Sequence, residues 1–424
     1  MSNCAIVGIN WGDEGKGRMV DLVTEQYDVV VRYQGGNNAG HTVINEYGKF
    51  ALHLIPSGIF RKGVVNVLGN GVVIDCEHLW KEISDLRAAG IDITPDNFRI
   101  SDRATLVFPF HRDLDALEES RLKDRAYGST KRGIAPVYSD KYQKKTIQAG
   151  ELLYPEYLRG RLAGILEWKN LTIENVYHAK PYSLDEMMAW VGRYGANLTP
   201  FICDTGAFLR QAEAQGKSIL FEAQLGALRD LDFGIWPYTS SSNNIAAYAP
   251  VGAGIPGSRV DRVLGIVKAY STCVGEGPFT CEWFGEEAEK LREAGGEYGA
   301  STGRPRRVGP LDLVATRYGV IMQGATELAF TKLDILSYMK EIPVCTHYEI
   351  DGVKTADFPF PALLEKARPV YTVLPGWQCD ISGVRRFEDL PAAAQDYVLF
   401  AEKALGCPIK YVSVGAQRDE IIER

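Results

Sequence analysis

The chain has 424 residues, of which 46% are hydrophobic and 24% charged, so a large core can form without disulfides or structural metals. Its net charge of −7 argues against a nucleic-acid-binding protein whose affinity comes from a basic surface. The eight scattered cysteines, the absence of a signal peptide and the absence of a long apolar run lead us to expect a cytoplasmic protein with no membrane partner.

The first third of the chain alternates short apolar runs with glycine-rich turns and amphipathic segments. Strands are predicted over residues 3–9 and 28–33, a third strand with a turn over residues 64–73, and helices over residues 19–26 and 76–90. This alternation is typical of an α/β fold with a large, mostly parallel central sheet and helices on both faces.

The rest of the chain continues the pattern with helical excursions. Further strands are predicted over residues 218–223, 262–272, 327–334, 341–350 and 409–415, and helices over residues 286–295 and 392–406. The stretch 100–215 is richer in helix signals, and no repeat or long polar linker interrupts the chain. We therefore expect one domain over residues 1–424, with a possible helical subdomain over residues 100–215.

A glycine-rich segment, GDEGKGR (residues 12–18), follows the first predicted strand. Glycines in this place let backbone N–H groups approach phosphate oxygens, and Lys16 adds a positive charge for the same oxygens. The segment departs from a P-loop because Asn10 replaces its first glycine and Gly17 replaces the Ser or Thr that binds magnesium. Asp13 is the oxygen ligand that we expect to hold Mg²⁺ instead. The pattern favours phosphate binding over a tight turn with a surface lysine.

A second glycine-rich segment, GGNNAGHT (residues 35–42), follows the second predicted strand. The carboxyl ends of neighbouring parallel strands meet at one crevice, so we expect this segment to lie opposite Asp13. Asn38 can donate a hydrogen bond to a phosphate or a base, and His41 can donate a proton or polarise an oxygen. A structural histidine in a turn stays open as the alternative from these residues alone.

Three arginines lie within four residues, at positions 304, 306 and 307, directly after the small residues GAST (299–302). Their guanidinium groups repel one another unless an anion lies among them, and each matches a carboxylate or a phosphate. A solvated basic turn is the alternative. The small residues favour a loop that closes on an anionic ligand.

The segment TKLD (residues 331–334) ends a hydrophobic strand. Asp334 can accept two hydrogen bonds from guanine, one from its ring N–H and one from its exocyclic amino group, and the stem of Lys332 can lie flat against the ring. Adenine lacks this pair of donors, so the segment predicts selection of GTP over ATP. The phosphate-binding segments elsewhere in the chain strengthen this interpretation.

Together these segments resemble the adenylosuccinate synthetase family. The likeness runs from the first predicted strand to the carboxyl terminus and includes, in order, NWGDEGKG, VVRYQGGNNAGHTV, LHLIPSGI, GNGVV, RGIAPVYSDK, SSSNN, GIVKAYST, GEGPF, GASTGRPRR, TKLD and VLPGW. So many separate motifs in the family's order argue strongly against a chance similarity. The resemblance implies a P-loop-like, GTP-binding ligase architecture.

The resemblance implies a ligase that joins L-aspartate to IMP in two steps and consumes GTP, in AMP biosynthesis. Asp13 would remove the N1 proton of IMP, and O6 of IMP would attack the γ-phosphate of GTP to give 6-phosphoryl-IMP. The amino group of aspartate would then displace phosphate. His41 would stabilise charge on the transferring phosphoryl group, Lys16 would neutralise phosphate charge, and Mg²⁺ would be held by Asp13 and the Gly40 carbonyl.

The resemblance also implies contact residues for each substrate, and a homodimer in which a basic residue of the partner subunit reaches the IMP phosphate. The implied GTP contacts are Gly12, Asp13, Glu14, Gly15, Lys16, Gly17, Arg18, Gly40, His41, Thr42, Arg306, Lys332, Leu333, Asp334, Ser413, Val414 and Gly415. The implied IMP contacts are Asp13, Glu14, Gly15, Lys16, Asn38, Ala39, Gly40, His41, Thr130, Lys144, Gln224, Leu225, Ser240 and Arg304. The implied aspartate contacts are Ala300, Ser301, Thr302, Gly303, Arg304, Pro305 and Arg306. Within this last set, Arg304 would face the amino acid and Arg306 would face GTP.

Three positions around IMP depart from the family pattern. The glutamine expected to contact the base aligns with Leu225, and Gln224 stands one place earlier, where a strand would point it the other way. Ser240 replaces a threonine and keeps the hydroxyl, whereas Lys144 replaces an arginine and keeps the charge but loses the planar fork. We therefore expect the activation chemistry to be retained, while the identity of the accepted nucleotide is less firmly defined.

Two alternatives to an IMP ligase stay open. One is a related enzyme that uses the same chemistry on another 6-oxopurine nucleotide, such as a GMP-type nucleotide or a deoxynucleotide, with Leu225 as its sequence signature. The other is a GTP-binding regulatory protein that has lost the ligase reaction. Retention of Asp13, His41 and the arginine-rich segment argues against the second alternative, because a switch needs neither an IMP base nor an aspartate clamp.

Overall fold

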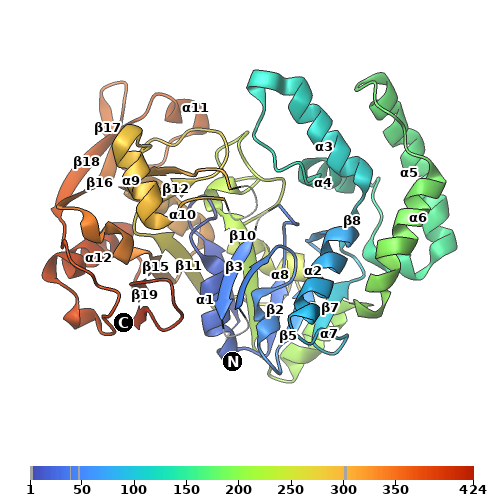
Figure 1. Cartoon of the computed structure of the whole chain (residues 1–424), viewed down its shortest axis with the longest axis horizontal. Helices are drawn as coiled ribbons and strands as arrows, with labels where there is room; N and C mark the ends of the chain where they lie inside the picture. Colours follow the sequence, from blue (N-terminus) through green and yellow to red (C-terminus); the bar gives the residue numbers. More distant parts are fainter. Residues whose placement is uncertain (1–2, 39, 46–47, 300–302) are drawn as a thin grey trace.

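A ten-stranded sheet forms the centre of the computed structural model, which describes residues 3–38, 40–45, 48–299 and 303–424 (Figure 1). The strands of this sheet are β1 (Cys4–Gly8), β2 (Val29–Arg32), β5 (Val65–Leu68), β7 (Phe98–Ser101), β9 (Ile202–Cys203), β10 (Ile219–Gly226), β11 (Arg262–Lys268), β15 (Glu327–Thr331), β19 (Ile409–Ser413) and β20 (Ile421–Glu423). Their order across the sheet is β20-β19-β15-β11-β1-β10-β2-β5-β7-β9. Every neighbouring pair is parallel except β19 and β20, so the predicted mostly parallel α/β sheet is confirmed.

Helices lie between these strands in the sequence, as a parallel sheet requires for its crossover connections. They are α1 (Lys16–Val23), α2 (Cys76–Ala88), α3 (Pro109–Leu122), α4 (Ile134–Gln143), α5 (Pro155–Asn175), α6 (Leu184–Tyr194), α7 (Thr205–Ala214), α8 (Ala249–Ala253), α9 (Gly285–Gly295), α10 (Leu313–Gln323), α11 (Pro361–Leu364) and α12 (Ala392–Leu405). None of the helices in the described residues has the length and apolar character that crossing a membrane requires.

Both faces of the central sheet are buried, and successive residues of one strand serve opposite faces. In β1, Ala5 and Val7 belong to a cluster that includes Leu209 of α7, whereas Ile6 belongs to a different cluster with Met19 of α1. Strand side chains alternate between faces, so an unbroken apolar run is what a sheet covered by helices on both sides needs.

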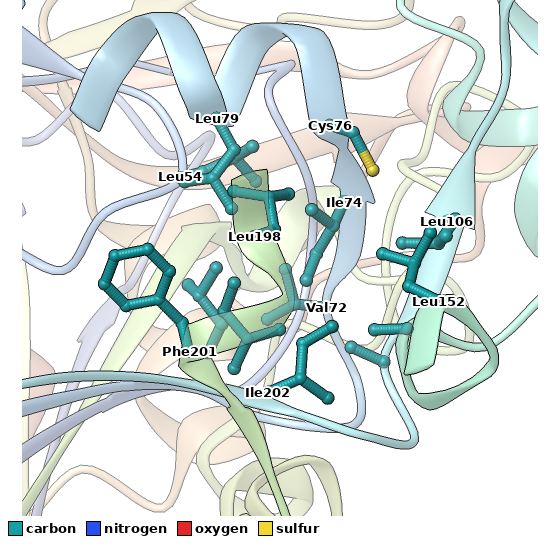
Figure 2. Close-up of a cluster of buried hydrophobic side chains, with 14 of the residues drawn as sticks. Leu54, Val72, Ile74, Cys76, Leu79, Leu106, Leu152, Leu198, Phe201 and Ile202 are labelled. Atoms are coloured by element: carbon teal, nitrogen blue, oxygen red, sulfur yellow. The ribbon is translucent and has the colours of Figure 1, made fainter. Parts of the chain in front are cut away.

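The helices α3 to α6 lie together beyond one edge of the sheet, in the upper right of Figure 1. Their core is continuous with the sheet edge. Figure 2 shows Ile202, the first residue of β9, near Val72, with Phe201 next to it in the chain and Leu54 close to Leu79 of α2 above them. This cluster holds the helical segment against the part of the sheet that carries β5, β7 and β9.

Several smaller sheets accompany the central one. They comprise β3 (His41–Asn45) with β4 (Gly48–Leu52), β6 (Val73–Asp75) with β8 (Thr105–Val107), β12 (Ser271–Cys273) with β13 (Arg307–Gly309), and β14 (Leu311–Asp312), β16 (Glu341–Ile350), β17 (Val353–Thr355) and β18 (Arg368–Pro375). The strand predicted over residues 341–350 is therefore real but lies outside the central sheet, because β16 pairs antiparallel with β18 along most of its length.

Local sequence accounts for the turns next to two of these elements. The turn predicted within residues 64–73 lies between β5 and β6 and includes Gly71, where a Cβ atom would lie 2.1 Å from the Tyr33 carbonyl oxygen. The helix predicted over residues 19–26 begins earlier, at Lys16, directly after Gly15 in the left-handed conformation. The first glycine-rich loop therefore leads straight into a helix N-terminus, the arrangement that favours anions.

Candidate active site at the carboxyl edge of the sheet

Loops from six strands of the central sheet meet at its carboxyl edge. Parallel neighbouring strands end at the same edge, so the segments that follow them come together. The segments that follow β1, β2, β10, β11, β15 and β19 at this edge include residues 9–15, 33–38, 227–230, 269–273, 332–334 and 414–417. The site is thus built from segments that are far apart in the sequence.

The first loop is shaped by its own carboxylate. Glu14 is buried, and its Oε1 accepts hydrogen bonds from the backbone N–H groups of Asn10 at 3.0 Å and Gly12 at 2.7 Å. Lys16 Nζ lies 3.2 Å from Glu14 Oε2 and donates to the Gly12 carbonyl at 2.9 Å. The Lys16 ammonium is therefore held inside the loop, beside the N-terminus of α1.

The first loop also packs closely against the end of β10. A Cβ atom at Gly12, whose φ is +107°, would lie 2.4 Å from Leu225 Cα, so only glycine fits there. Leu225 itself has a φ of +60°, which is uncommon for a branched side chain and is the kind of backbone outlier found at functional sites. The β1–β10 register shifts between Ile6 and Gly8, and this irregularity allows the turn.

Gln224, next to Leu225, points its amide at the second glycine-rich segment. Its Nε2 donates to the Gly36 carbonyl at 2.8 Å, and its Oε1 accepts from the Gly36 N–H at 3.0 Å. The side chain of Gln224 thus acts as a brace between β10 and the loop after β2. The next side chain along the chain, that of Leu225, is half-buried at the sheet edge.

Asp13 lies in a cluster of positive charge. Thr272 Oγ1 donates to its carboxylate at 2.7 Å, Lys268 Nζ lies 3.6 Å from Oδ2, and Arg306 Nε lies 3.3 Å from Oδ2. Burial by itself would raise the pKa of Asp13, but Lys268 and Arg306 bring that pKa below its ordinary value. The carboxylate is therefore ionised at neutral pH and able to accept a proton or a cation.

His41 is oriented by a buried carboxylate. Its Nδ1 lies 2.5 Å from Glu222 Oε1, and Ser57 donates to the same carboxylate through its N–H at 2.8 Å and its hydroxyl at 2.7 Å. Burial lowers the pKa of His41, while His41 and Arg32 hold the pKa of Glu222 down against the effect of burial. A neutral His41 therefore donates from Nδ1, and its buried Nε2 has no hydrogen-bond partner among the described residues.

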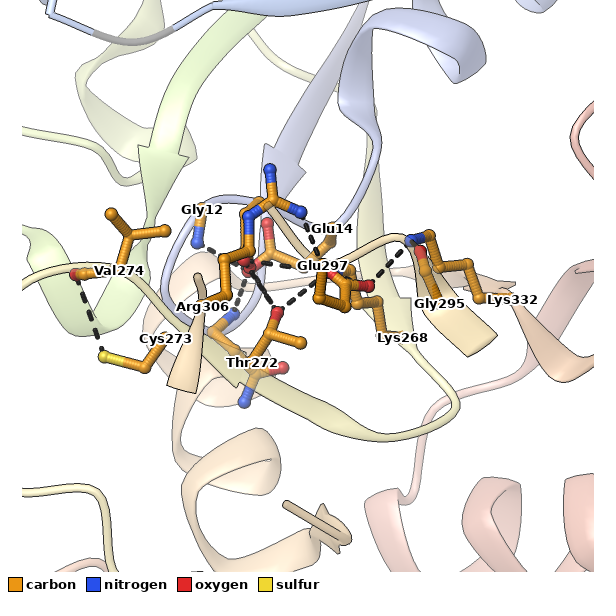
Figure 3. A network of polar contacts seen from close by, with 12 residues as sticks. Gly12, Glu14, Lys268, Thr272, Cys273, Val274, Gly295, Glu297, Arg306 and Lys332 are labelled. Atoms are coloured by element: carbon orange, nitrogen blue, oxygen red, sulfur yellow. Dashed lines mark hydrogen bonds and ion pairs between the residues drawn. The ribbon is translucent and has the colours of Figure 1, made fainter. Parts of the chain in front are cut away.

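Glu297 is the centre of a second network, which Figure 3 shows. Its carboxylate is fully buried and accepts from Lys268 Nζ at 2.9 Å, Arg306 Nη1 at 2.6 Å, Lys332 Nζ at 2.6 Å and the Tyr270 hydroxyl at 2.5 Å. Burial would raise the pKa of Glu297, but Lys268, Lys332 and Arg306 hold it well below its ordinary range. Two residues predicted to bind ligands, Arg306 and Lys332, are thus bonded to one protein carboxylate.

The segment predicted to bind guanine follows β15. Lys332 has a φ of +61° and precedes a 3₁₀ turn, η8 (Leu333–Tyr338), in which Leu333 is buried. Asp334 is partly buried, and its Oδ1 is enclosed with no hydrogen-bond partner among the residues that the structure describes. Burial raises the pKa of Asp334, and a backbone hydrogen bond and the charges of Lys332 and Arg18 offset that rise only in part.

Arg18 joins the first loop to the end of β19. Its Nη1 donates to Ser413 Oγ at 2.8 Å and to the Gly415 carbonyl at 2.6 Å. Val414, between these two residues, is buried. The predicted GTP contacts at positions 18 and 413–415 therefore lie together, close to Asp334, whose charge acts on Arg18.

The remaining predicted contacts are more scattered. Asn38 accepts a hydrogen bond from the Gly36 N–H, and Ser240 Oγ lies 3.3 Å from Ser242 Oγ. Thr130 is exposed in the loop before α4, Lys144 is exposed at the C-cap of α4, and Arg304 and Pro305 are exposed beside Gly303, before β13. Gly17 is buried in the first turn of α1, and the backbone of Gly40 is described. Ala39, Ala300, Ser301, Thr302 and the side chain of Thr42 lie outside the described part of the chain.

Sequence reasoning missed four side chains that hold the predicted ones in place: Lys268, Thr272, Glu222 and Glu297. A signal existed for the first two, because they lie in GIVKAYST at the end of a hydrophobic strand. Glu222 and Glu297 gave no such signal, because an isolated glutamate in a strand or a loop is usually solvated.

A separate buried cluster has metal-ligating side chains but satisfies itself. Cys281, Asp312 and Cys345 offer ligand atoms within 4.8 Å of one another. The Cys281 thiol donates to Asp312 Oδ2 at 3.2 Å, the Tyr348 hydroxyl donates to the same oxygen at 2.5 Å, and the Cys345 thiol donates to the His347 carbonyl at 3.3 Å. These contacts describe a hydrogen-bonded core, which needs no ion.

Comparison with known proteins agrees with this geometry. The family model described as adenylosuccinate synthetase matches residues 5–422. The adenylosuccinate synthetase of Caldanaerobacter subterraneus subsp. tengcongensis is 45% identical, with 100% of this chain and 99% of the relative covered. Adenylosuccinate synthetase 2 of Pseudoalteromonas translucida is 46% identical, with both chains fully covered.

Solved structures give the same result. The fully ligated adenylosuccinate synthetase of Plasmodium falciparum superposes with a TM-score of 0.93 at 34% identity, and each chain is fully covered. The cyanophage S-2L succinoaminodeoxyadenylate synthetase, bound to dGMP and dATP, superposes with a TM-score of 0.61 at 18% identity over 100% of this chain and 95% of that one, which indicates a shared fold alone. With its full-length family match, its close relatives and a sheet edge that carries the expected motifs, this chain belongs to the adenylosuccinate synthetase family of GTP-dependent ligases.

Proposed function

We propose that this protein joins L-aspartate to IMP at the expense of GTP, giving adenylosuccinate, GDP and phosphate, as a step of AMP biosynthesis. One observation carries the proposal: an ionised Asp13, a His41 whose Nε2 is open among the described residues and an Asp334 whose Oδ1 is likewise open all lie in segments that follow strands at the same edge of one sheet. A base, a phosphoryl-binding group and a guanine-reading carboxylate are the groups that this reaction needs.

The first step makes O6 of IMP a nucleophile. Asp13 takes the proton from N1, O6 attacks the γ-phosphorus of GTP, the O6–P bond forms, and the bond to the β-phosphate oxygen breaks to release GDP. When the phosphates bind, His41 takes up a proton from solvent at Nε2 and from there stabilises the charge on the transferring group, held in line by Glu222 at Nδ1. Lys16, fixed by Glu14, adds positive charge at the helix N-terminus.

The second step replaces the activated oxygen. The amino group of aspartate attacks C6, the C6–N bond forms, the C6–O bond breaks with loss of phosphate, and the amine loses its proton. Residues 300–306 would hold aspartate, with Arg304 toward its carboxylates and Arg306 toward GTP. Guanine would be read by Lys332, Leu333 and Asp334 and by residues 413–415.

Mg²⁺ is part of the proposal, and the donor set fits it. Asp13 has a carboxylate held in its ionised form, and a carboxylate and a backbone carbonyl are the hard oxygen ligands that Mg²⁺ prefers. Asp13 and the Gly40 carbonyl would hold the ion, which neutralises charge on the phosphates when bound.

We also propose that the protein is a homodimer and lies in the cytoplasm. Its chain would form one domain over residues 1–424, with residues 100–215 as a helical subdomain. Large exposed side chains on α4 and α5 and in the stretch between them support an interface next to Lys144, namely Tyr142, Leu153, Tyr154, Tyr157, Trp168 and Leu171. All eight cysteines lie in the described ranges and are free thiols, which supports a reducing compartment. Strands from both ends of the chain in one sheet support a single domain.

The test is an assay of the purified protein with Mg²⁺, GTP, aspartate and IMP. Purine absorbance and phosphate release should change together and in equal amounts. GTP binding without product would instead favour a GTP-binding regulatory protein that lacks ligase activity. Product that forms in the absence of GTP and of IMP would contradict the proposed reaction.

A second candidate, ligation to another 6-oxopurine nucleotide, is favoured by one observation. The Gln224 amide is already bonded to both backbone groups of Gly36, so it is not available to a base unless that brace breaks. Leu225 offers hydrocarbon in its place. We expect Leu225→Gln to improve discrimination for IMP over GMP by about 10-fold, the scale of one hydrogen bond to the base. If the ratio of kcat/KM for IMP to that for the competing nucleotide were the same in the wild type and in Leu225→Gln, Leu225 would not be a determinant of specificity.

A further inference from the structure

We propose that Glu297 is a positioning residue that couples the arginine-rich segment, which is proposed to hold aspartate, to the guanine site by holding Arg306 of that segment and Lys332 on one carboxylate. The inference rests on the proposed function, because the ligands of Arg306 and Lys332 are those proposed above. It adds a residue to which no contact with any substrate is assigned.

The first link is between Glu297 and the arginine-rich segment. The Arg306 N–H donates to the Glu297 carbonyl at 2.9 Å, and Arg306 Nη1 donates to Glu297 Oε2 at 2.6 Å. The neighbouring residues Tyr298 and Pro305 form an antiparallel bridge. The backbone and side-chain contacts of Glu297 together therefore fix the position of Arg306, the residue directly before β13.

The second link runs to two strands of the central sheet. Lys332, which follows β15, donates to Glu297 Oε1 at 2.6 Å and to the Gly295 carbonyl at 2.7 Å. Lys268, at the end of β11, donates to both carboxylate oxygens, at 3.0 and 2.9 Å. Figure 3 shows these side chains converging on Glu297 from different elements.

The charges in this network make the three cations interdependent. Lys268, Arg306 and Lys332 share Glu297 with none of its carboxylate exposed to water, and Asp13 contacts two of the three. Inside a protein such interactions are screened weakly, so a change at one partner is felt by the others. When Arg306 turns to a substrate, Glu297 is left to Lys332 and Lys268 and holds them more strongly. Occupation of one site therefore alters the affinity of the other, and the effect is reciprocal.

The experiment compares Glu297→Gln with Glu282→Gln in the full-length enzyme. Glu282 is a matched control, because it binds Arg307, the residue next to Arg306 in β13, with 2.8 Å between its Oε2 and Arg307 Nε. KM for aspartate is measured at low and at saturating GTP, and the ratio of the two values is the coupling factor. We expect Glu297→Gln to raise KM for aspartate and for GTP by about 10-fold each, to lower kcat by less than about 3-fold, and to bring the coupling factor to about 1. Glu282→Gln should leave all four quantities within about 3-fold.

A folded Glu297→Gln enzyme whose KM values and coupling factor match those of the wild type would overturn the inference. A fall in kcat alone would do the same, since a positioning role predicts a change in KM. If the Glu297→Gln variant does not fold, Glu297→Asp tests the inference instead. This variant keeps the negative charge but moves it away from Arg306 and Lys332 by the length of one methylene group. A coupling factor closer to 1 than that of the wild type supports the inference, and an unchanged factor overturns it. A wild-type enzyme with no ligase activity would instead refute the proposed function, a result that needs no variant.

Discussion

The two halves of the candidate site differ in what their functional groups contact. Around His41, Glu222 and Ser57 satisfy one side of the imidazole and leave Nε2 open. Around Asp13, by contrast, the groups that the proposed reaction needs are bonded to one another: Arg306 contacts Asp13 and Glu297.

This difference indicates two ways of preparing a site for charged ligands. The His41 half is preorganised, because its supporting carboxylate is buried and the Nε2 atom of His41 has no partner to give up among the described residues. In the Asp13 half, opposite charges from separate loops neutralise one another, so ligands must replace protein contacts. The three predictions that follow test each half, and they are ordered by the size of the expected effect.

The largest effect is expected at the proposed base. Asp13→Asn keeps the shape of the side chain and removes its ability to accept a proton, so kcat should fall by about 10³-fold or more. Steady-state kinetics and thermal unfolding together check this. Asp28→Asn is the control, because Asp28 accepts from Ser218 N at 2.9 Å at the opposite edge of the sheet and should leave kcat within about 3-fold. Near-normal turnover of Asp13→Asn would eliminate the residue as the base.

The next effect is expected in the preorganised half. Glu222→Gln removes the charge that orients His41, so kcat should fall by about 100-fold with smaller changes in KM. Glu82→Gln is the matched control: Glu82 is also a buried carboxyl, it accepts from the N–H groups of His53 and Leu54, and burial raises its pKa to about 7. If both variants lost the same activity, general destabilisation would explain the loss and orientation of His41 would not.

The smallest effect is a proton taken up on binding. Burial lowers the pKa of His41 in the free enzyme, so its imidazole is neutral at pH 7. A phosphoryl group at Nε2 favours the charged form and raises that pKa, so protons should be taken up on binding at pH values between the pKa of the free enzyme and that of the complex, and the uptake should decline at higher pH.

Calorimetric titration of a non-hydrolysable GTP analogue with Mg²⁺ and IMP, in buffers of different ionisation enthalpy, measures this uptake. His41→Gln should abolish it. If His41→Gln took up as many protons as the wild type, the proton would belong to another group, and His41 would be neutral in both the free and the bound enzyme.

Much of the fold follows from local patterns. The apolar run at residues 3–9 predicts β1, and GDEGKGR predicts a phosphate-binding turn, because strand and turn propensities depend on a few adjacent residues. The same reasoning misplaced β16, whose partner β18 is known only from the tertiary structure. It also could not foresee that Leu225 takes a left-handed conformation, which follows from the approach of Gly12.

The amino-acid sequence by itself determined the order of strands and glycine-rich turns, the family, and which residues carry candidate chemistry. Only the tertiary structure decided which charges meet. Thr272 contacts Asp13 across 259 positions, and Lys332 contacts Glu297 across 35. The physical reason is that turn and strand preferences are local, whereas the partner of a buried charge depends on which strands become neighbours in the sheet.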